Sequence, residues 1–279
     1  MNLPDYSSLH VTVDDGVATV VLDHPPVNTL DGTMMLELHD LLGQRLRHDD
    51  SVRVIVFESA HEEFFLAHVD FGIFDSYPDL QAVAKDYPHV NVHQGIGELL
   101  RSQPQVTIVK LAGIARAGGA EFVAAADMAF AGRERGKIAQ SEVLLGIIPG
   151  GGGTQLLLER AGRNRALEVV LGADLLDADT AALYGWINRA VADDELDAFV
   201  ATLAANIAAL DPGVIEQAKR ALPAADITRG LNVEHDGWNE LVNREAPALK
   251  MKLALERDLQ SAGPERDLEG FLRQVAADV

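Results

Sequence analysis

Glu121 follows a run of small residues, and together they could do chemistry next to a carbonyl group. The run, Ala117 to Ala120, is predicted to open a helix after a buried strand at 106–111 and a turn at Gly113. Small residues let another molecule approach the backbone, and the first N–H groups of a helix have no partner inside it. Because Glu121 lies three residues after Gly118, its carboxylate shares a helix face with donors that could hold a developing negative charge.

The same segment also has a purely structural interpretation. A Glu three residues into a helix often reaches back to a backbone N–H as part of a capping box. Glycine-rich turns between a strand and a helix are also common in α/β proteins. The chemical interpretation gains support from a second acidic stretch, because Glu142 lies near the start of another glycine-rich loop at 140–155, just before a predicted helix.

The composition of the 279-residue chain excludes several classes of function. Its formal net charge of −20 argues against a nucleic-acid partner, since phosphate binding needs a concentrated Lys/Arg face. The absence of cysteine excludes disulfides, thiolate metal sites and cysteine nucleophiles. The nine histidines form no H-E-x-x-H motif, so we expect no catalytic metal, and we interpret His61 and His68 as ordinary loop histidines.

Membrane and nucleotide sites are not indicated either. No run of about 18 apolar residues could cross a membrane, and the first residues lack the order of a signal peptide, so we expect a cytoplasmic protein. Gly113 and Gly118 have the spacing of a phosphate loop, but the required Lys and Ser/Thr are missing. The run of four glycines at 150–153 does not fit a dinucleotide fingerprint, and no G-x-S-x-G motif is present.

Strands alternate with helices over the first two thirds of the chain, which predicts an α/β core followed by a helical C-terminal region. We place the core at 1–205 and the helical region at 206–279, with interruptions at Pro247 and Pro264. The predicted strands lie at 10–13, 17–22, 53–58, 106–111, 128–131 and 137–139. The predicted helices lie at 35–47, 90–103, 154–161, 164–171, 177–183, 196–210 and 213–222. Residues 59–74 are expected to form an irregular loop, and 76–89 a surface loop around a short helix that could serve as a lid.

Four motifs resemble those of the crotonase superfamily, the enoyl-CoA hydratase/isomerase family of acyl-CoA enzymes. They are HPPVNTL (His24–Leu30), FFLAHVD (Phe64–Asp70), AGIARAGGAE (Ala112–Glu121) and SEVLLGIIPGGGGTQ (Ser141–Gln155). The last is nearly diagnostic, because no common unrelated motif has those residues in that order. The resemblance covers most of 11–191, and it implies a spiral of ββα units with a helical C-terminal region.

The resemblance also implies a function. The backbone N–H groups of Val69 and Gly118 would form an oxyanion hole for the thioester carbonyl of a bound acyl-CoA. Glu121 and Glu142 would be the catalytic carboxylates that add water across the 2,3 double bond of an enoyl-CoA, with their individual roles left open. Further substrate-binding positions are implied at Ala67, Asp70 and Gly119. Coenzyme A enters only as part of the substrate, and no other cofactor is implied.

Alternatives remain open at the level of the reaction. The same scaffold hosts enoyl-CoA isomerases, dehydratases, thioester hydrolases and C–C lyases, and a fold does not decide among them. A third possibility is a protein that binds acyl-CoA without efficient chemistry, because His68 and Val69 replace the family's Gly-Ala. Arg116 also stands at a position that is more often apolar. The family generally forms trimers or hexamers, so the resemblance implies a homotrimer or homohexamer with subunit contacts in the helical C-terminal region.

Overall fold

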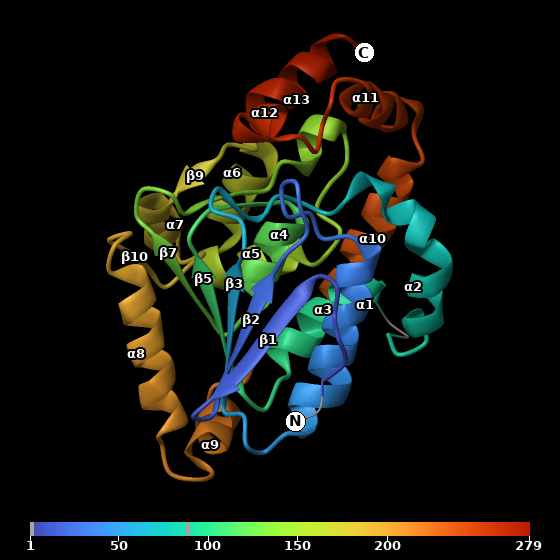
Figure 1. Ribbon diagram of the computed structural model, residues 1–279. Helices are drawn as coiled ribbons and strands as arrows, with labels where there is room; N and C mark the ends of the chain where they lie inside the picture. Colours follow the sequence, from blue (N-terminus) through green and yellow to red (C-terminus); the bar gives the residue numbers. More distant parts are fainter. Residues whose placement is uncertain (1–2, 88–89) are drawn as a thin grey trace.

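A six-stranded sheet forms the centre of the molecule (Figure 1). The computed structural model describes residues 3–87 and 90–279, except for the side chains of 74–77. In sheet order the strands are β1 (Leu9–Asp14), β2 (Val17–Leu22), β3 (Val54–Ser59), β5 (Val106–Leu111), β7 (Met128–Gly132) and β10 (Arg189–Val191). The first pair is antiparallel and the following pairs are parallel, which confirms the predicted α/β class.

The predicted hairpin at the start of the chain is confirmed. Asp14 pairs with Val17, and the two residues between them, Asp15 and Gly16, have φ values of 43° and 82°. A two-residue hairpin turn with positive φ at both positions favours the Asp-Gly pair found here.

A second sheet of four short strands positions the candidate site. In sheet order it contains β4 (Phe64–Leu66), β6 (Ile114–Arg116), β8 (Lys137–Ala139) and β9 (Leu176–Asp177). Only β8 is predicted from the sequence, where a charged turn at 132–137 precedes it. Strands of two or three residues are too short to show an alternating pattern, and the other three have no such turn signal. The irregular loop expected at 59–74 is therefore wrong in part, because it contains β4. The turn expected at Gly113 is present, but β6 lies between it and the helix that was expected to follow. β4 and β6 are parallel neighbours, so the residues that follow them leave the sheet at the same edge.

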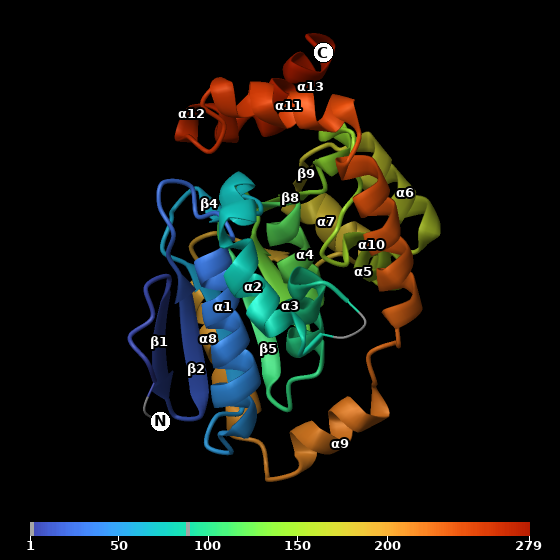
Figure 2. The same ribbon diagram turned by 90° about the vertical axis from the view of Figure 1, so that its right-hand side faces the viewer.

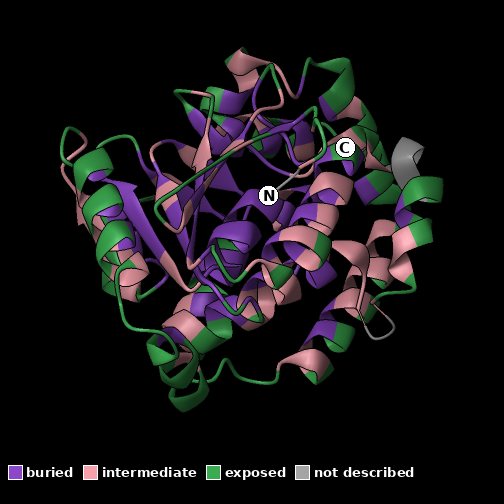
Figure 3. Ribbon diagram, turned by 60° about the horizontal axis from the view of Figure 1, so that its bottom comes forward, coloured by how far each residue is buried: buried purple, intermediate pink, exposed green. Residues whose placement is uncertain are grey.

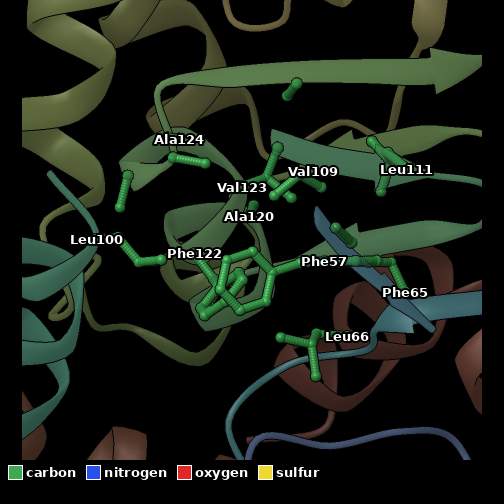
Figure 4. Packing of buried hydrophobic residues seen from close by; sticks show 14 of the residues in the cluster. Phe57, Phe65, Leu66, Leu100, Val109, Leu111, Ala120, Phe122, Val123 and Ala124 are labelled. Atoms are coloured by element: carbon green, nitrogen blue, oxygen red, sulfur yellow. The ribbon is translucent and has the colours of Figure 1, made fainter. Parts of the chain in front are cut away.

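Alternate residues of the central strands pack on opposite faces of the main sheet, as the two-residue repeat of a strand requires. Val54 and Ile108 pack with α8 (Leu196–Ala208) on one face. On the other face, Phe57 lies edge-on to Phe122 of the helix that begins at Gly118, with ring centroids 5.1 Å apart (Figure 4). All eight residues of α4 (Gly118–Ala125) are buried, and Figure 3 shows that buried residues gather in the interior while the outer helices carry the exposed ones.

Six further helices agree closely with the predicted ones. Their bounds are α1 (Gly32–Asp40), α3 (Val92–Arg101), α5 (Gly153–Ala161), α6 (Arg163–Gly172), α7 (Ala178–Tyr184) and α9 (Val214–Ala221). Short irregular turns of helix lie at Leu41–Arg45, Leu46–His48, Phe71–Ser76 and Glu142–Leu145. Within the predicted lid segment, the expected short helix is α2 (Tyr77–Ala84), whereas residues 88 and 89 lie outside the described part of the chain.

At the end of the chain, α11 (Glu245–Glu256), α12 (Ala262–Arg266) and α13 (Leu268–Ala277) lie across one end of the molecule, and α10 (Thr228–Val242) runs along its side (Figure 2). These helices confirm the predicted helical C-terminal region. Pro247 and Pro264 do not interrupt helices, because each lies in the first turn of one, where proline's missing N–H costs no hydrogen bond. No helix in the described part of the chain is both long and apolar enough to cross a membrane.

Candidate functional site

A cavity of about 560 Å³ lies where the two glycine-rich motifs meet the C-terminal helices. Five residues singled out from the sequence line it, and they come from three separate motifs: Val69, Asp70, Gly118, Glu121 and Glu142. Two other residues singled out from the sequence, Ala67 and Gly119, are not among those that line it. Ala67 is fully buried, and its N–H donates to the Asn28 carbonyl over 3.0 Å. Gly119 packs so closely against Leu66 that a Cβ would overlap the Leu66 carbonyl oxygen.

The backbone around Val69 is fixed by a bridge to Leu30. The Leu30 N–H donates to the His68 carbonyl over 2.8 Å, and the Leu30 carbonyl accepts from the Asp70 N–H over 3.0 Å. In a parallel bridge of this kind the N–H of the central residue points to the opposite side. The N–H of Val69 is therefore not used by Leu30.

Gly118 lies directly against Val69. A Cβ at Gly118 would overlap the Val69 side chain, so only glycine allows this approach. Ala117 before it has φ 47° and ψ −122°, a backbone conformation that non-glycine residues rarely adopt and that is found mainly at functional sites. As the first residue of α4, Gly118 has an N–H without a partner in the helix. Two neighbouring amide donors at this cavity could stabilise an anionic oxygen.

Glu121 uses only one of its carboxylate oxygens to hold the second glycine-rich loop. Its Oε1 accepts hydrogen bonds from the N–H groups of Gly151 and Gly153, both over 2.8 Å. The capping-box interpretation of Glu121 is therefore wrong, since its partners lie thirty residues away. Burial raises the pKa of Glu121 to about 7, although the backbone amides of this loop act in the opposite direction.

Glu142 opens a short turn of helix at the same cavity. When the side-chain amide of Gln140 is oriented with its nitrogen toward Glu142, that nitrogen donates to both carboxylate oxygens, over 2.7 and 3.0 Å. Burial, and after it the nearby charge of Glu121, raises the pKa of Glu142 well above its usual range. Two carboxyl groups that disfavour each other's ionisation can serve as one acid and one base.

A third buried carboxylate, Glu234 of α10, was not predicted. It accepts hydrogen bonds from Gly152 N (2.6 Å), from Thr154 N and Oγ1 (2.9 and 2.5 Å) and from Gln94 Nε2 (3.1 Å). Successive N–H groups of the glycine-rich loop thus go alternately to Glu121 and to Glu234. Burial and the charge of Glu121 raise the pKa of Glu234 to about 7. The sequence around Glu234 carries no motif that could have identified it.

His68 is not an ordinary loop histidine, which corrects the prediction. It is 3% exposed, its Nδ1 donates to the Val69 carbonyl over 2.7 Å, and its Nε2 lies 2.8 Å from Glu265 Oε1 in α12. Both partners are acceptors, so the arrangement favours the protonated ring, which donates from both nitrogens. Burial alone would lower the pKa of His68, but the Glu265 carboxylate outweighs it and raises the pKa.

Arg116, which stands where the family more often has an apolar residue, also bonds to the C-terminal helices. Its guanidinium donates to both oxygens of Glu269 over 2.7 and 3.1 Å, and to the Glu265 carbonyl over 2.9 Å. The side chain of Arg116 is fully buried. The two departures from the family pattern, at 68 and 116, are therefore both paired with acidic residues of the last two helices.

Comparison with known proteins identifies the family. The sequence profile described as "Enoyl-CoA hydratase/isomerase" matches residues 12–237. The chain belongs to the enoyl-CoA hydratase/isomerase family. Its members share the crotonase fold, which confirms the resemblance drawn from the four motifs.

Individual relatives of the family agree with this assignment. A crystal structure from Streptomyces avermitilis, described as "a putative enoyl-CoA hydratase", is 58% identical, with a TM-score of 0.95 and coverage of 98% of this chain and 99% of that one. The crotonyl-CoA hydratase of Syntrophomonas wolfei is 25% identical over 84% of this chain and 89% of its own length. The carnitinyl-CoA dehydratase of Proteus mirabilis is 30% identical over 82% of this chain and 87% of its own length.

Proposed function

We propose that the protein is an enoyl-CoA hydratase, which adds water across the 2,3 double bond of an enoyl-CoA thioester. The observation that carries the proposal is the meeting of two buried carboxyl groups, Glu121 and Glu142, with the neighbouring amides of Val69 and Gly118 at one cavity. Isomerases of the family usually keep only the later acid, whereas this chain has both.

The amides of Val69 and Gly118 would hold the thioester oxygen. Polarising that carbonyl makes C3 electrophilic and stabilises the enolate that forms when water attacks. A donor of this kind contributes about 3 kcal/mol to the stabilisation of the transition state. The closeness of Val69 to Gly118 supports this pairing, because both donors must reach the same oxygen.

The carboxyl groups would divide the proton transfers between them. Glu121 is the better base, since two backbone N–H groups stabilise its ionised form. Glu142 is the better acid, because burial and the charge of Glu121 favour its neutral form. As the C3–O bond forms, Glu121 takes a proton from water and Glu142 supplies a proton to C2. General acid–base catalysis of this type contributes about 10²–10⁴-fold.

The apolar part of the cavity lining suits an acyl chain. It is made of apolar side chains that include contributions from α2, α10, α11 and α13, namely Leu80, Trp238, Met251, Leu268 and Leu272. An apolar pocket of this size with a few polar groups at one side is typical of a small-molecule site. The C-terminal helices would therefore contribute to substrate binding.

The test is an assay with crotonyl-CoA, in which hydration removes the ultraviolet absorbance of the conjugated thioester. We expect turnover by the wild type, and a loss of at least about 100-fold in kcat for Glu142→Gln with little change in the affinity for butyryl-CoA. Tight binding of butyryl-CoA without turnover of any enoyl-CoA would instead indicate a binding protein. Turnover of a 3-enoyl-CoA but not of a 2-enoyl-CoA would indicate an isomerase.

A further inference from the structure

His93 lies in a slot between the two glycine-rich motifs. It is the second residue of α3, whose start is fixed because Asn91 donates to the Gly150 carbonyl over 2.8 Å. A Cβ at either Gly118 or Gly151 would overlap the His93 ring, so the absence of side chains at these two glycines provides the space that the ring occupies. The ring also lines the cavity.

The Nδ1 of His93 faces the one oxygen of Glu121 that the glycine-rich loop does not use. The distance from Nδ1 to Oε2 is 3.6 Å, which is too long for a direct hydrogen bond. The other ring nitrogen, Nε2, is on the side of Gly118, where a backbone interaction favours a proton on the ring. Burial lowers the pKa of His93 to about 4, so the ring carries a single proton near neutral pH.

These contacts place two hydrogen-bond acceptors opposite each other. With its proton on Nε2, His93 offers a lone pair at Nδ1, and ionised Glu121 offers another at Oε2. Two facing acceptors 3.6 Å apart repel each other unless a donor lies between them. A water molecule has two O–H groups and can donate one to each, which leaves its own lone pairs free.

We propose that His93 and Glu121 together hold the water that attacks C3, so that His93 is a further catalytic residue of the reaction. This inference rests on the proposed hydratase function. In the step, the water oxygen bonds to C3, one of its protons passes to Glu121, and the proton that reaches C2 comes from Glu142. His93 neither gains nor loses a proton. Its Nδ1 accepts a hydrogen bond from the second O–H, which becomes the hydroxyl of the product.

Matched variants test the role of Nδ1. Asn places a side-chain oxygen near the position of Nδ1, Leu has a similar shape without an acceptor, and Phe retains a ring without nitrogen. We expect kcat with crotonyl-CoA to fall about tenfold or more for His93→Leu and His93→Phe, the effect of one lost hydrogen bond, and to recover in part for His93→Asn. KM and butyryl-CoA affinity should change little. Wild-type kcat in His93→Phe, or equal losses in all three variants, would overturn the inference.

A double-mutant cycle separates this role from a structural one. If His93 acts on the water that Glu121 activates, then His93→Phe should cost little in a Glu121→Gln background. Independent, multiplying losses would overturn the inference while leaving the hydratase function intact.

The protonation of the His93 ring can be measured without any turnover, so it tests the inference even if the protein is not a hydratase. Nitrogen NMR of the histidine-labelled protein should show a neutral His93 with its proton on Nε2. A proton on Nδ1 would overturn the inference, whichever reaction the enzyme catalyses.

Discussion

Replacing Glu121 by Gln should remove the proposed base and at the same time make the protein more stable. The carbonyl oxygen of Gln can accept the two hydrogen bonds that Oε1 now accepts from Gly151 and Gly153. Its NH₂ group takes the place of Oε2, which faces the cavity, so the loop should keep its structure. We expect kcat to fall by at least about 100-fold, because an amide cannot take a proton from water.

The gain in stability follows from the raised pKa of Glu121. The pKa rises from 4.5 to about 7 on folding, and each unit corresponds to about 1.4 kcal/mol. Below pH 4.5 the carboxyl is neutral in both states and adds nothing. Between pH 4.5 and about 7, Glu121 is ionised in the unfolded chain but still neutral in the folded protein, so the free energy of unfolding falls as pH rises. Above about pH 7 this loss reaches roughly 3 kcal/mol. Gln cannot ionise, so it avoids this loss.

The assay is urea denaturation of both proteins above pH 7 and below pH 4.5. Glu121→Gln should gain about 3 kcal/mol in free energy of unfolding above pH 7 and almost nothing at the acidic pH. An equal gain at both pH values, or none above pH 7, would refute the reasoning from the buried charge.

Glu234→Gln is the matched control, because it makes the same chemical change at a carboxyl whose pKa is also raised to about 7. Glu234 uses both oxygens, and an NH₂ group in place of Oε2 would face the N–H and hydroxyl of Thr154. We therefore expect a loss of about 2 kcal/mol at the acidic pH, where Glu121→Gln is unchanged.

Three further predictions concern the surroundings of the site. Arg116→Met should lower the free energy of unfolding, measured in urea, by about 3–5 kcal/mol, because it leaves Glu269 buried without its partner. The double variant Arg116→Met with Glu269→Leu should recover most of this loss, because it removes the unpaired charge. Gly118→Ala should lower turnover of crotonyl-CoA sharply, since its Cβ would overlap Val69 and His93; wild-type turnover would show that this approach is not needed. His68→Leu should have a lower free energy of unfolding than the wild type at a pH below 6.5. This difference should shrink as the pH rises through the raised pKa of His68 in the folded protein. A difference that is independent of pH would contradict the ion pair.

Local patterns made part of this site predictable from the sequence. The helix that begins at Gly118 and carries Glu121, and the glycine-rich loop after Glu142, each combine small residues with an acid within a few positions. Their chemistry depends on neighbours in the sequence, so it can be inferred without the fold. The fold class follows from the alternation of long strands and helices in the same way. The three-residue strands β4 and β6 show no alternating pattern, and they lack the charged turn that made the equally short β8 predictable.

The rest depends on contacts between distant parts of the chain. Glu234 reaches the loop over about eighty residues, and Glu265 reaches His68 over 197. Each lies in a helix with no motif, and its function appears only when that helix is placed over the cavity. His93 is similar, because its slot exists only where two separate glycine motifs meet. No local sequence pattern indicates that two such distant motifs are in contact.

The contact between His68 and Glu265 bears on whether the protein is an enzyme or only binds acyl-CoA. The departure at 68 and 69 suggested a member that binds acyl-CoA without efficient chemistry, since bulkier residues flank the proposed donor at Val69. In the structure the His68 ring bonds to the Val69 carbonyl and to Glu265, so the larger side chain ties the loop to α12. Arg116, beside Gly118, is tied to α13 through Glu269. Both backbone segments that would supply the proposed oxyanion donors are thus tied to the C-terminal helices. The departures at 68 and 116 have a structural role of their own, so they are no argument for a protein that only binds acyl-CoA.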